Sequence, residues 1–339
     1  MADLHNIIIA EWKLLSGKSL HLVSLSYQTF GPPIGTAPVV LVNHALTGNS
    51  NVSGPAGWWN DLIGRAKTVD TRHYTVLAFN IPGNGYDGVK ENLLYNYKDI
   101  TAEDVAALFW KGLEKRGIHK LFALIGGSLG GGIAWHMAAL RPDATEHLIP
   151  IATDWKATDW VIANTLVQER ILNNSADPLA DARLHAMLLY RTPQSLKQRF
   201  NREQLGGSFD IELWLDKHGK KLASRFTLPA YKLMNRLLRS INIAGNDSFL
   251  AVAKKISSTV HLVDVDTDLL FTPDETQVTY VSLKAAGITV TYNEIHSVHG
   301  HDAFLIEHGQ LSKILKPVFE VSEGYYTKAY NEGATEHKV

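Results

Sequence analysis

The residues Gly126-Gly-Ser-Leu-Gly130 match the pattern G-x-S-x-G, which places a serine where it could act as a nucleophile. The apolar run Leu121 to Ile125 before the motif is typical of a buried strand, and Gly131 to Leu140 after it is typical of a helix. A sharp strand-to-helix turn would lift the Ser128 hydroxyl above the sheet, and the glycines would let other backbone pass close by. The motif and its context therefore predict nucleophilic chemistry at Ser128.

A serine hydroxyl is a poor nucleophile at neutral pH and needs a base within hydrogen-bond reach and an acid that orients the base. In enzymes with this type of turn the acid follows the serine in the chain, and the histidine comes last. The loop after the predicted strand 260–265 offers two carboxylates for the acid, Asp266 and Asp268. Asp268 lies better in the loop and is the predicted acid, with Asp266 as the alternative.

Three histidines, His296, His299 and His301, follow the next predicted strand, 288–294. His301 stands last, directly before a helical stretch, and is the predicted base. Together with His299, and with Asp302 next to it, His301 could also ligate a metal ion. Because no HExxH helix and no cysteine accompanies these residues, we predict no metal site.

Acyl chemistry at a serine needs two N–H groups that stabilise the oxyanion of the tetrahedral intermediate. The residue after the nucleophile, Leu129, is expected to supply one of them. The loop Asn43-His-Ala-Leu-Thr-Gly48, which follows the predicted strand 38–42, is expected to supply the other through Leu46. His44 is interpreted as a packing residue at the end of the strand.

A second glycine motif, Gly83-Asn-Gly-Tyr-Asp-Gly88, matches the dinucleotide-binding pattern G-x-G-x-x-G. A dinucleotide site also requires a helix that begins inside the motif, and the residues from Val89 onward do not start as a clean helix. We therefore expect a loop here and no nicotinamide site.

Composition excludes several classes of function. The 339 residues are 45% hydrophobic and carry a formal net charge of −1, with no Lys/Arg block that would track a nucleic acid backbone. The absence of cysteine excludes disulfides, thiolate metal sites and a cysteine nucleophile. No signal-peptide order and no apolar run of about 18 residues is present, so a cytoplasmic protein without membrane partners is expected.

The hydrophobic pattern predicts an α/β fold with a mostly parallel sheet. Strands and helices alternate in the first half of the chain as β-α-β-α-β, which calls for parallel pairing. A helix that begins with a capping box of Thr101 and Asp104 and stops at Gly117 is part of this order. The predicted strands are 19–28 (antiparallel), 38–42, 74–79, 121–125 and 148–152.

From about Asp154 to Val252 the pattern becomes helical, with predicted helices at 161–174, 180–190, 193–200 and 229–238. We interpret residues 154–252 as a helical lid inserted into a catalytic domain of residues 1–153 and 253–339. The strand and helix rhythm then resumes with strands 260–265 and 288–294 and helices 273–286 and 303–315. The polar tail from about Ser322 is expected to be loosely ordered.

Four motifs, in this order, resemble homoserine O-acetyltransferases from about residue 20 to residue 318. They are Asn43-His-Ala-Leu-Thr-Gly48, Gly57-Trp-Trp59 with Leu62-Ile-Gly64, Ile125-Gly-Gly-Ser-Leu-Gly-Gly131 and Gly300-His-Asp-Ala-Phe-Leu305. The resemblance implies an α/β-hydrolase fold with a helical lid and a homodimer formed through that lid. It also implies transfer of an acetyl group from acetyl-CoA, as a co-substrate, to the hydroxyl of L-homoserine in methionine biosynthesis, without a tightly bound cofactor.

The family's triad falls on Ser128, Asp268 and His301, the residues reached above. The resemblance further implies that Arg183 holds the substrate carboxylate, with Tyr190 in the same lid segment, and that Asp302 binds the substrate amino group. A planar guanidinium suits a carboxylate, and a carboxylate suits an ammonium group. The alternative interpretation of Arg183 is a solvated helix face.

Two positions depart from the family pattern. The stretch Asn80-Ile-Pro-Gly-Asn-Gly-Tyr-Asp-Gly88 lacks the usual Ser-Thr-Gly-Pro, and Leu129 replaces the usual methionine after the nucleophile. The first change could reshape the pocket for the acyl group or CoA. The sequence therefore predicts ping-pong acetyl transfer through an acyl-serine. Use of succinyl-CoA or serine, or ester hydrolysis on the same fold, remains as an alternative.

Overall fold

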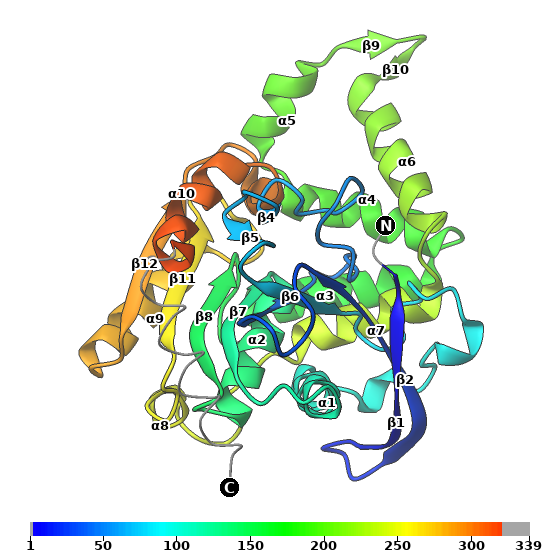
Figure 1. The fold of residues 1–339 in the computed structure, drawn as a ribbon. Helices are drawn as coiled ribbons and strands as arrows, with labels where there is room; N and C mark the ends of the chain where they lie inside the picture. Colours follow the sequence, from blue (N-terminus) through cyan, green and yellow to red (C-terminus); the bar gives the residue numbers. More distant parts are fainter. Residues whose placement is uncertain (1–2, 321–339) are drawn as a thin grey trace, which may run out of the picture.

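An eight-stranded sheet with the strand order β1-β2-β6-β3-β7-β8-β11-β12 forms the centre of the computed structural model, which describes residues 3–320 (Figure 1). Within this sheet β6, β3, β7, β8, β11 and β12 pair in parallel, whereas β2 pairs antiparallel with both β1 and β6. The predicted mostly parallel sheet is confirmed. Its strands are β1 (His5–Lys13), β2 (Ser19–Phe30), β3 (Val39–Asn43), β6 (Thr75–Phe79), β7 (Leu121–Gly127), β8 (Thr145–Ile151), β11 (Thr259–Val265) and β12 (Val290–Ile295).

The central strands are buried on both faces, which explains their continuous apolar sequences. Every residue of β3 is buried, and its side chains alternate between two hydrophobic clusters. Leu41 belongs to the cluster that includes α1 (Ala102–Lys115) and α2 (Leu129–Leu140), and Val40 to the cluster that includes α10 (His308–Phe319). The sheet is therefore covered by helices on both sides.

The predicted order β-α-β-α-β is confirmed as β6, α1, β7, α2 and β8. Thr101 and Asp104 form the predicted capping box at the start of α1, and the helix stops before Gly117, whose φ is +74°. The Trp110 indole N–H donates to the carbonyl oxygen of Met137 at 2.9 Å and ties α1 to α2. These contacts hold α1 against α2, the helix that follows the turn at Ser128.

Residues 154–252, here called the helical segment, hold most of the remaining helices. The four predicted helices are present to within two residues, but α6, α8 and a small hairpin were not predicted; the division into a catalytic domain and a lid stays a prediction. In Figure 1 the helix α5, the hairpin and α6 project away from the sheet. The elements are α3 (Asp159–Asn174), α4 (Pro178–Tyr190), α5 (Pro193–Phe200), β9 (Gln204–Leu205), β10 (Ser208–Phe209), α6 (Asp210–Ala223), α7 (Leu228–Arg239) and α8 (Phe249–Ala253).

The structure corrects three expectations about single elements. Helix α2 begins at Leu129 and not at Gly131, because Ser128 itself occupies the N-cap position. The helix predicted at 303–315 is two elements, the 3-10 helix η3 (Gly300–Leu305) and α10, which are separated at Ile306 and Glu307. Strand β1, which extends the sheet at its antiparallel edge, was not predicted.

The remaining elements are short or peripheral. The loop of Gly83, Gly85 and Gly88 leads into a 3-10 helix and not into an α-helix, as expected. No helix among residues 3–320 is long and apolar enough to cross a membrane. The elements not yet given are β4 (Ile63–Gly64), β5 (Val69–Asp70), η1 (Lys90–Asn92), η2 (Tyr97–Asp99) and α9 (Pro273–Ala285).

Candidate active site

Ser128 occupies a strained turn between β7 and α2. Its φ of 54° and ψ of −124° lie outside the regions that residues with a side chain normally adopt. The turn is held by crowding that only glycine tolerates. A Cβ at Gly126 would lie 2.2 Å from the carbonyl oxygen of Gly130, and a Cβ at Gly130 would lie 2.3 Å from the carbonyl oxygen of Asn43. The spacing of the motif is thus a steric requirement of this turn.

Three side chains from distant parts of the chain meet at the C-terminal ends of the parallel strands. The Ser128 hydroxyl oxygen lies 2.8 Å from Nε2 of His301, and Nδ1 of His301 lies 2.6 Å from Oδ2 of Asp268. Ser128 follows β7, Asp268 follows β11 and His301 follows β12. All three residues are buried. The structure therefore brings the three predicted triad residues into one hydrogen-bonded chain.

The Asp268 carboxylate is fixed by its own loop. Its Oδ1 accepts hydrogen bonds from the backbone N–H groups of Leu270 at 2.7 Å and Phe271 at 3.0 Å, which leaves Oδ2 to face the imidazole. The His301 ring also packs between aromatic rings, with centroids 6.0 Å from that of Phe271 and 5.5 Å from that of Phe304. Ring orientation and tautomer are thus set before substrate arrives.

The environment of His301 raises its pKa. Burial by itself would lower that pKa, but the charge and hydrogen bond of Asp268, together with the charge of Asp302, outweigh burial. Compared with a free histidine, His301 therefore binds its second proton more readily in this site. A base must be neutral to accept a proton, so the raised pKa sets the acid limit of any reaction that begins at Ser128.

We expect kcat/KM to fall as the pH decreases through the raised pKa of His301, with a midpoint above the ordinary value of 6.5. Substituting Asp302→Asn removes one carboxylate that raises this pKa, so the midpoint should move to lower pH. The pH profile of acylation by an activated acetyl ester measures it, because that substrate has no amino group for Asp302 to bind. A wild-type midpoint at or below 6.5 would contradict the assignment of His301.

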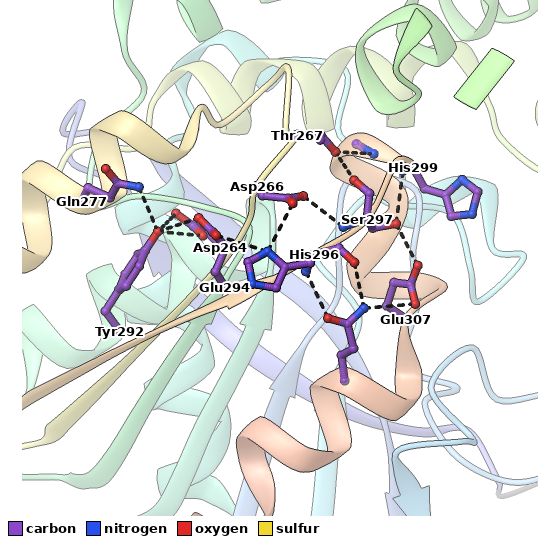
Figure 2. A network of polar contacts seen from close by, with 12 residues as sticks. Asp264, Asp266, Thr267, Gln277, Tyr292, Glu294, His296, Ser297, His299 and Glu307 are labelled. Atoms are coloured by element: carbon purple, nitrogen blue, oxygen red, sulfur yellow. Dashed lines mark hydrogen bonds and ion pairs between the residues drawn. The ribbon is translucent and has the colours of Figure 1, made fainter. Parts of the chain in front are cut away.

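The alternative acid, Asp266, lies in a separate network. Its Oδ2 is 3.2 Å from Nδ1 of His296, whose side chain is 70% exposed, and its Oδ1 accepts from the backbone N–H of Ser297 at 3.0 Å. Figure 2 shows this network, which continues from His296 through Glu294 to Tyr292. Asp266 is thus paired with a surface histidine that has no contact with Ser128.

Thr267 joins the loop of the acid to the loop of the base. Its hydroxyl donates to the carbonyl oxygen of Ser297 at 2.5 Å and accepts from the backbone N–H of Gly300 at 3.1 Å (Figure 2). Thr267 precedes Asp268 in the chain, and Gly300 precedes His301. The hydrogen bond between Thr267 and Gly300 therefore also helps to set the distance between Asp268 and His301.

The helical segment holds the same loop from the other side. The Thr192 hydroxyl donates to the carbonyl oxygen of Val298 at 2.5 Å, and Nη2 of Arg191 lies 2.9 Å from Nδ1 of His299. Gly300 adopts a φ of +68°, and a Cβ there would lie 3.1 Å from the carbonyl oxygen of Tyr190. These contacts, here called the segment-to-loop clamp, were not predicted, because nothing in the sequence pairs positions about 100 residues apart.

The two predicted oxyanion donors lie where α2 begins and where β3 has ended. Leu129 is the first residue of α2, and Leu46 is buried in the loop after β3. Among residues 3–320 the backbone N–H groups of Leu129 and Leu46 donate to no protein atom. Both groups are therefore free to stabilise a substrate oxyanion.

His44 braces the loop that carries Leu46. Its Nδ1 lies 2.8 Å from the carbonyl oxygen of Ala45, and its Nε2 accepts from the backbone N–H of Ile81 at 3.0 Å. Burial lowers the pKa of His44 to about 4, so the ring is neutral and its Nδ1–H donates to Ala45. In the sequence, the role of His44 was indicated only by its position directly after β3.

Arg183, Tyr190 and Asp302 gather beside His301. The guanidinium carbon of Arg183 lies 5.4 Å from the centre of the Tyr190 ring, and that ring lies 5.6 Å from the ring of His301. In the described part of the chain, neither Arg183 nor Asp302 forms a salt bridge. Burial raises the pKa of Asp302, and the positive charges of Arg183, His301 and Arg191 oppose that rise. A cation and a carboxylate near the triad thus have no ion-pair partner among the described residues.

A narrow cavity with about 20 Å³ of space, enough for about one water molecule, lies beside the triad. Its walls include Leu46, Tyr190, Tyr231 and Leu270. This cavity alone is too small for an amino acid substrate.

Comparison with known proteins identifies relatives of this chain. Residues 38–202 match a family model described as the alpha/beta hydrolase fold. The chain is 32% identical to a homoserine O-acetyltransferase of Cyclobacterium marinum, over 92% of this chain and 93% of that protein. It is 30% identical to a homoserine O-acetyltransferase of Methanococcus vannielii, over 95% of this chain and 74% of that protein.

A solved structure also matches most of the chain. The crystal structure of a homoserine O-acetyltransferase from Bacillus anthracis superposes with a TM-score of 0.84 and 19% identity. The match covers 95% of this chain and 98% of that one. The expected α/β-hydrolase fold is therefore confirmed.

Proposed function

Because this chain belongs to the homoserine O-acetyltransferase family of enzymes, we propose that it transfers an acetyl group from acetyl-CoA to the hydroxyl of L-homoserine. The observation that carries the proposal is the buried chain of Ser128, His301 and Asp268, with its contacts of 2.8 Å and 2.6 Å. Such a chain activates a serine for acyl transfer through a covalent intermediate.

In the first half of the reaction, Nε2 of His301 takes the proton of the Ser128 hydroxyl as its oxygen attacks the thioester carbonyl. The N–H groups of Leu129 and Leu46 stabilise the oxyanion that forms. The intermediate then collapses, the bond from carbon to sulfur breaks, and the thiol of CoA leaves with the proton from His301. Asp268 holds the imidazole in the useful tautomer and stabilises its charged form.

In the second half, the homoserine hydroxyl takes the place of the thiol. His301 accepts its proton as the oxygen attacks the acetyl-Ser128 ester, and the proton then returns to the serine oxygen. The product is O-acetyl-homoserine. Transfer rather than hydrolysis requires that water be excluded at this stage.

Homoserine carries a carboxylate and an ammonium group, and the site offers one partner for each. Arg183 would hold the carboxylate, Asp302 would hold the ammonium group, and Tyr190 would form the wall between them. The absence of a salt bridge at Arg183 and at Asp302 within residues 3–320 supports this assignment. An acceptor bound at both ends presents its hydroxyl in one orientation only.

Substituting Arg183→Gln should raise the KM for homoserine by about 10-fold or more, because one charge-assisted contact contributes roughly 1.5–3 kcal/mol. The rate of acylation by acetyl-CoA should change far less. Arg170→Gln is a matched control, since this arginine lies exposed on α3. Steady-state kinetics with homoserine as the varied substrate measure the effect. An unchanged KM in the Arg183 variant would remove Arg183 from the acceptor site.

Release of CoA with and without homoserine tests the proposed reaction. We expect rapid release only when acetyl-CoA and homoserine are both present, and parallel assays with succinyl-CoA and with serine define the donor and the acceptor. Fast cleavage of simple esters, together with CoA release that ignores homoserine, would instead identify an esterase on the same fold.

We further propose a cytoplasmic homodimer that acts in methionine biosynthesis and needs acetyl-CoA only as a co-substrate. Support for association through the helical segment comes from large apolar side chains exposed on α3 and α4. They are Trp160, Leu166, Val167 and Leu188, all between 45% and 53% exposed. Light scattering after gel filtration measures the mass in solution.

A further inference from the structure

A second cavity, of about 290 Å³, lies where η2, α3 and α7 meet. Its size approaches that of small-molecule sites, which begin at roughly 300 Å³. Asn235 lines both this cavity and the narrow one beside the triad. The lining residues, here called the basic cleft, are Tyr97, Lys98, Glu169, Leu172, Lys232, Asn235, Arg236 and Arg239.

The charges of the basic cleft do not balance. Four of its side chains are cationic, and Glu169 is the one carboxylate among them. Glu169 is taken by Arg239, with an N–O distance of 3.2 Å. Within residues 3–320, Lys98, Lys232 and Arg236 have no carboxylate within salt-bridge distance. The buried Nε of Arg236 has no hydrogen-bond partner. A buried donor without a partner is rare and points to a missing acceptor.

The positions of the cations are not explained by helix stability. Lys232, Arg236 and Arg239 have the spacing i, i+4, i+7, which places them on one face of α7 while the opposite face packs into the core. The helix dipole favours cations in the last turn, which accounts for Arg236 and Arg239 but not for Lys232. Lys98 comes from a different element, η2. Two like charges four residues apart destabilise a helix unless an anion lies between them.

We propose that the basic cleft binds the phosphate group of a small organic phosphate. A phosphate dianion offers several acceptor oxygens, which suit the fork of Arg236 and the point charges of Lys98 and Lys232. The cleft is a partly open hollow of about 290 Å³ between three elements, a size that fits a small molecule. The proposal does not rest on the proposed acyl transfer, because binding of phosphate can be measured without turnover.

Two sources of phosphate fit this chemistry. One is the nucleotide end of an acyl-CoA donor, and the other is an independent phosphorylated metabolite. Asn235 lines both cavities, so a ligand bound in the basic cleft would affect the cavity beside the triad through this residue. Its amide donates to the carbonyl oxygen of Thr165 at 2.9 Å, between the two cavities.

Calorimetric titration of the purified full chain with inorganic phosphate tests the site. The double substitution Lys232→Gln with Arg236→Gln should weaken phosphate binding by about 10-fold or more, since two charge-assisted contacts are lost. The double substitution Lys254→Gln with Lys255→Gln is the matched control, because these lysines are exposed beyond α8. Equal affinities in the two double variants, or no phosphate binding by the wild-type chain, would overturn the proposal.

A substitution that should increase the affinity for phosphate separates loss of the site from misfolding of a variant. Glu169→Gln removes the only carboxylate of the cleft and frees Arg239, so phosphate should bind more tightly. Weaker binding in this variant, with an unchanged melting temperature, would overturn the proposal.

The same titrations with CoA and dephospho-CoA identify the source of the phosphate. Weaker binding of CoA in the Lys232 and Arg236 double variant, together with competition by inorganic phosphate, assigns the cleft to the donor nucleotide. Unchanged CoA binding with loss of phosphate binding assigns it to a separate metabolite, and both results support the site. Because phosphate binding is measured without turnover, a failure of homoserine acetylation would not be mistaken for a failure of the cleft.

Discussion

Replacing Ser128 by alanine should lower the rate of acyl transfer by about 10⁴-fold or more, because the nucleophile is lost while the rest of the site remains. The fold should persist. Alanine and serine share the cost of the positive φ at this position, and the backbone N–H of residue 128 keeps its 2.9 Å hydrogen bond to the carbonyl oxygen of Ile151. His301 should also stay in place, because Asp268 and the surrounding rings hold it independently of the serine.

Two measurements on this variant separate loss of chemistry from loss of structure. CoA release in the presence of homoserine reports the chemistry, and the thermal melting curve reports the fold. A fluorophosphonate probe should label the wild-type chain at Ser128 and leave the variant unlabelled. A variant that kept more than about one hundredth of the wild-type rate would show that another group is the nucleophile.

Substituting Asp268→Asn should lower kcat by about 10⁴-fold, because it reverses the tautomer of His301. Oδ1 of Asp268 accepts from two backbone N–H groups, so the asparagine oxygen must take that position. The asparagine NH₂ group then faces Nδ1 of His301 and forces that nitrogen to accept. The proton moves to Nε2, which can no longer accept from the Ser128 hydroxyl.

Asp266→Asn is the matched control for this substitution. The change is the same and lies two residues away, but Asp266 contacts His296 and the backbone of Ser297 rather than His301. Its kcat should therefore stay within about 10-fold of wild type. If the Asp266 variant lost more activity than the Asp268 variant, the roles of the two carboxylates would have to be exchanged.

The parts of the fold that follow from local rules could be predicted from the sequence. Continuous apolar runs identified the buried strands, and the Thr101 capping box located the start of α1. Strand β1 was not predicted because it is an edge strand with six exposed positions among its nine. Helix α6 was not predicted because most of its exposed residues are charged and only Gly219 and Leu222 are buried.

The candidate site shows the same division. Ser128, Asp268 and His301 could be located because each stands directly after a strand, and strand ends of a parallel sheet meet at one edge. His44, Thr267 and the residues of the segment-to-loop clamp could not be located. Their partners are backbone atoms or side chains 30 or more residues away, as in the contacts of His44 with Ile81 and of Thr267 with Ser297. Side chains of that kind leave no periodic or spaced pattern in a sequence.

The segment-to-loop clamp couples the position of the helical segment to the loop that carries His301. Thr192 and Arg191 hold Val298 and His299, only three and two residues before His301. If the helical segment swings outward to admit a substrate, it must release these contacts, and the imidazole loses part of the support that aligns it with the serine. An open molecule would thus hold its base less firmly, and the base would be fully supported only after the segment closes. Such coupling would limit hydrolysis of the thioester donor while the site is open to water.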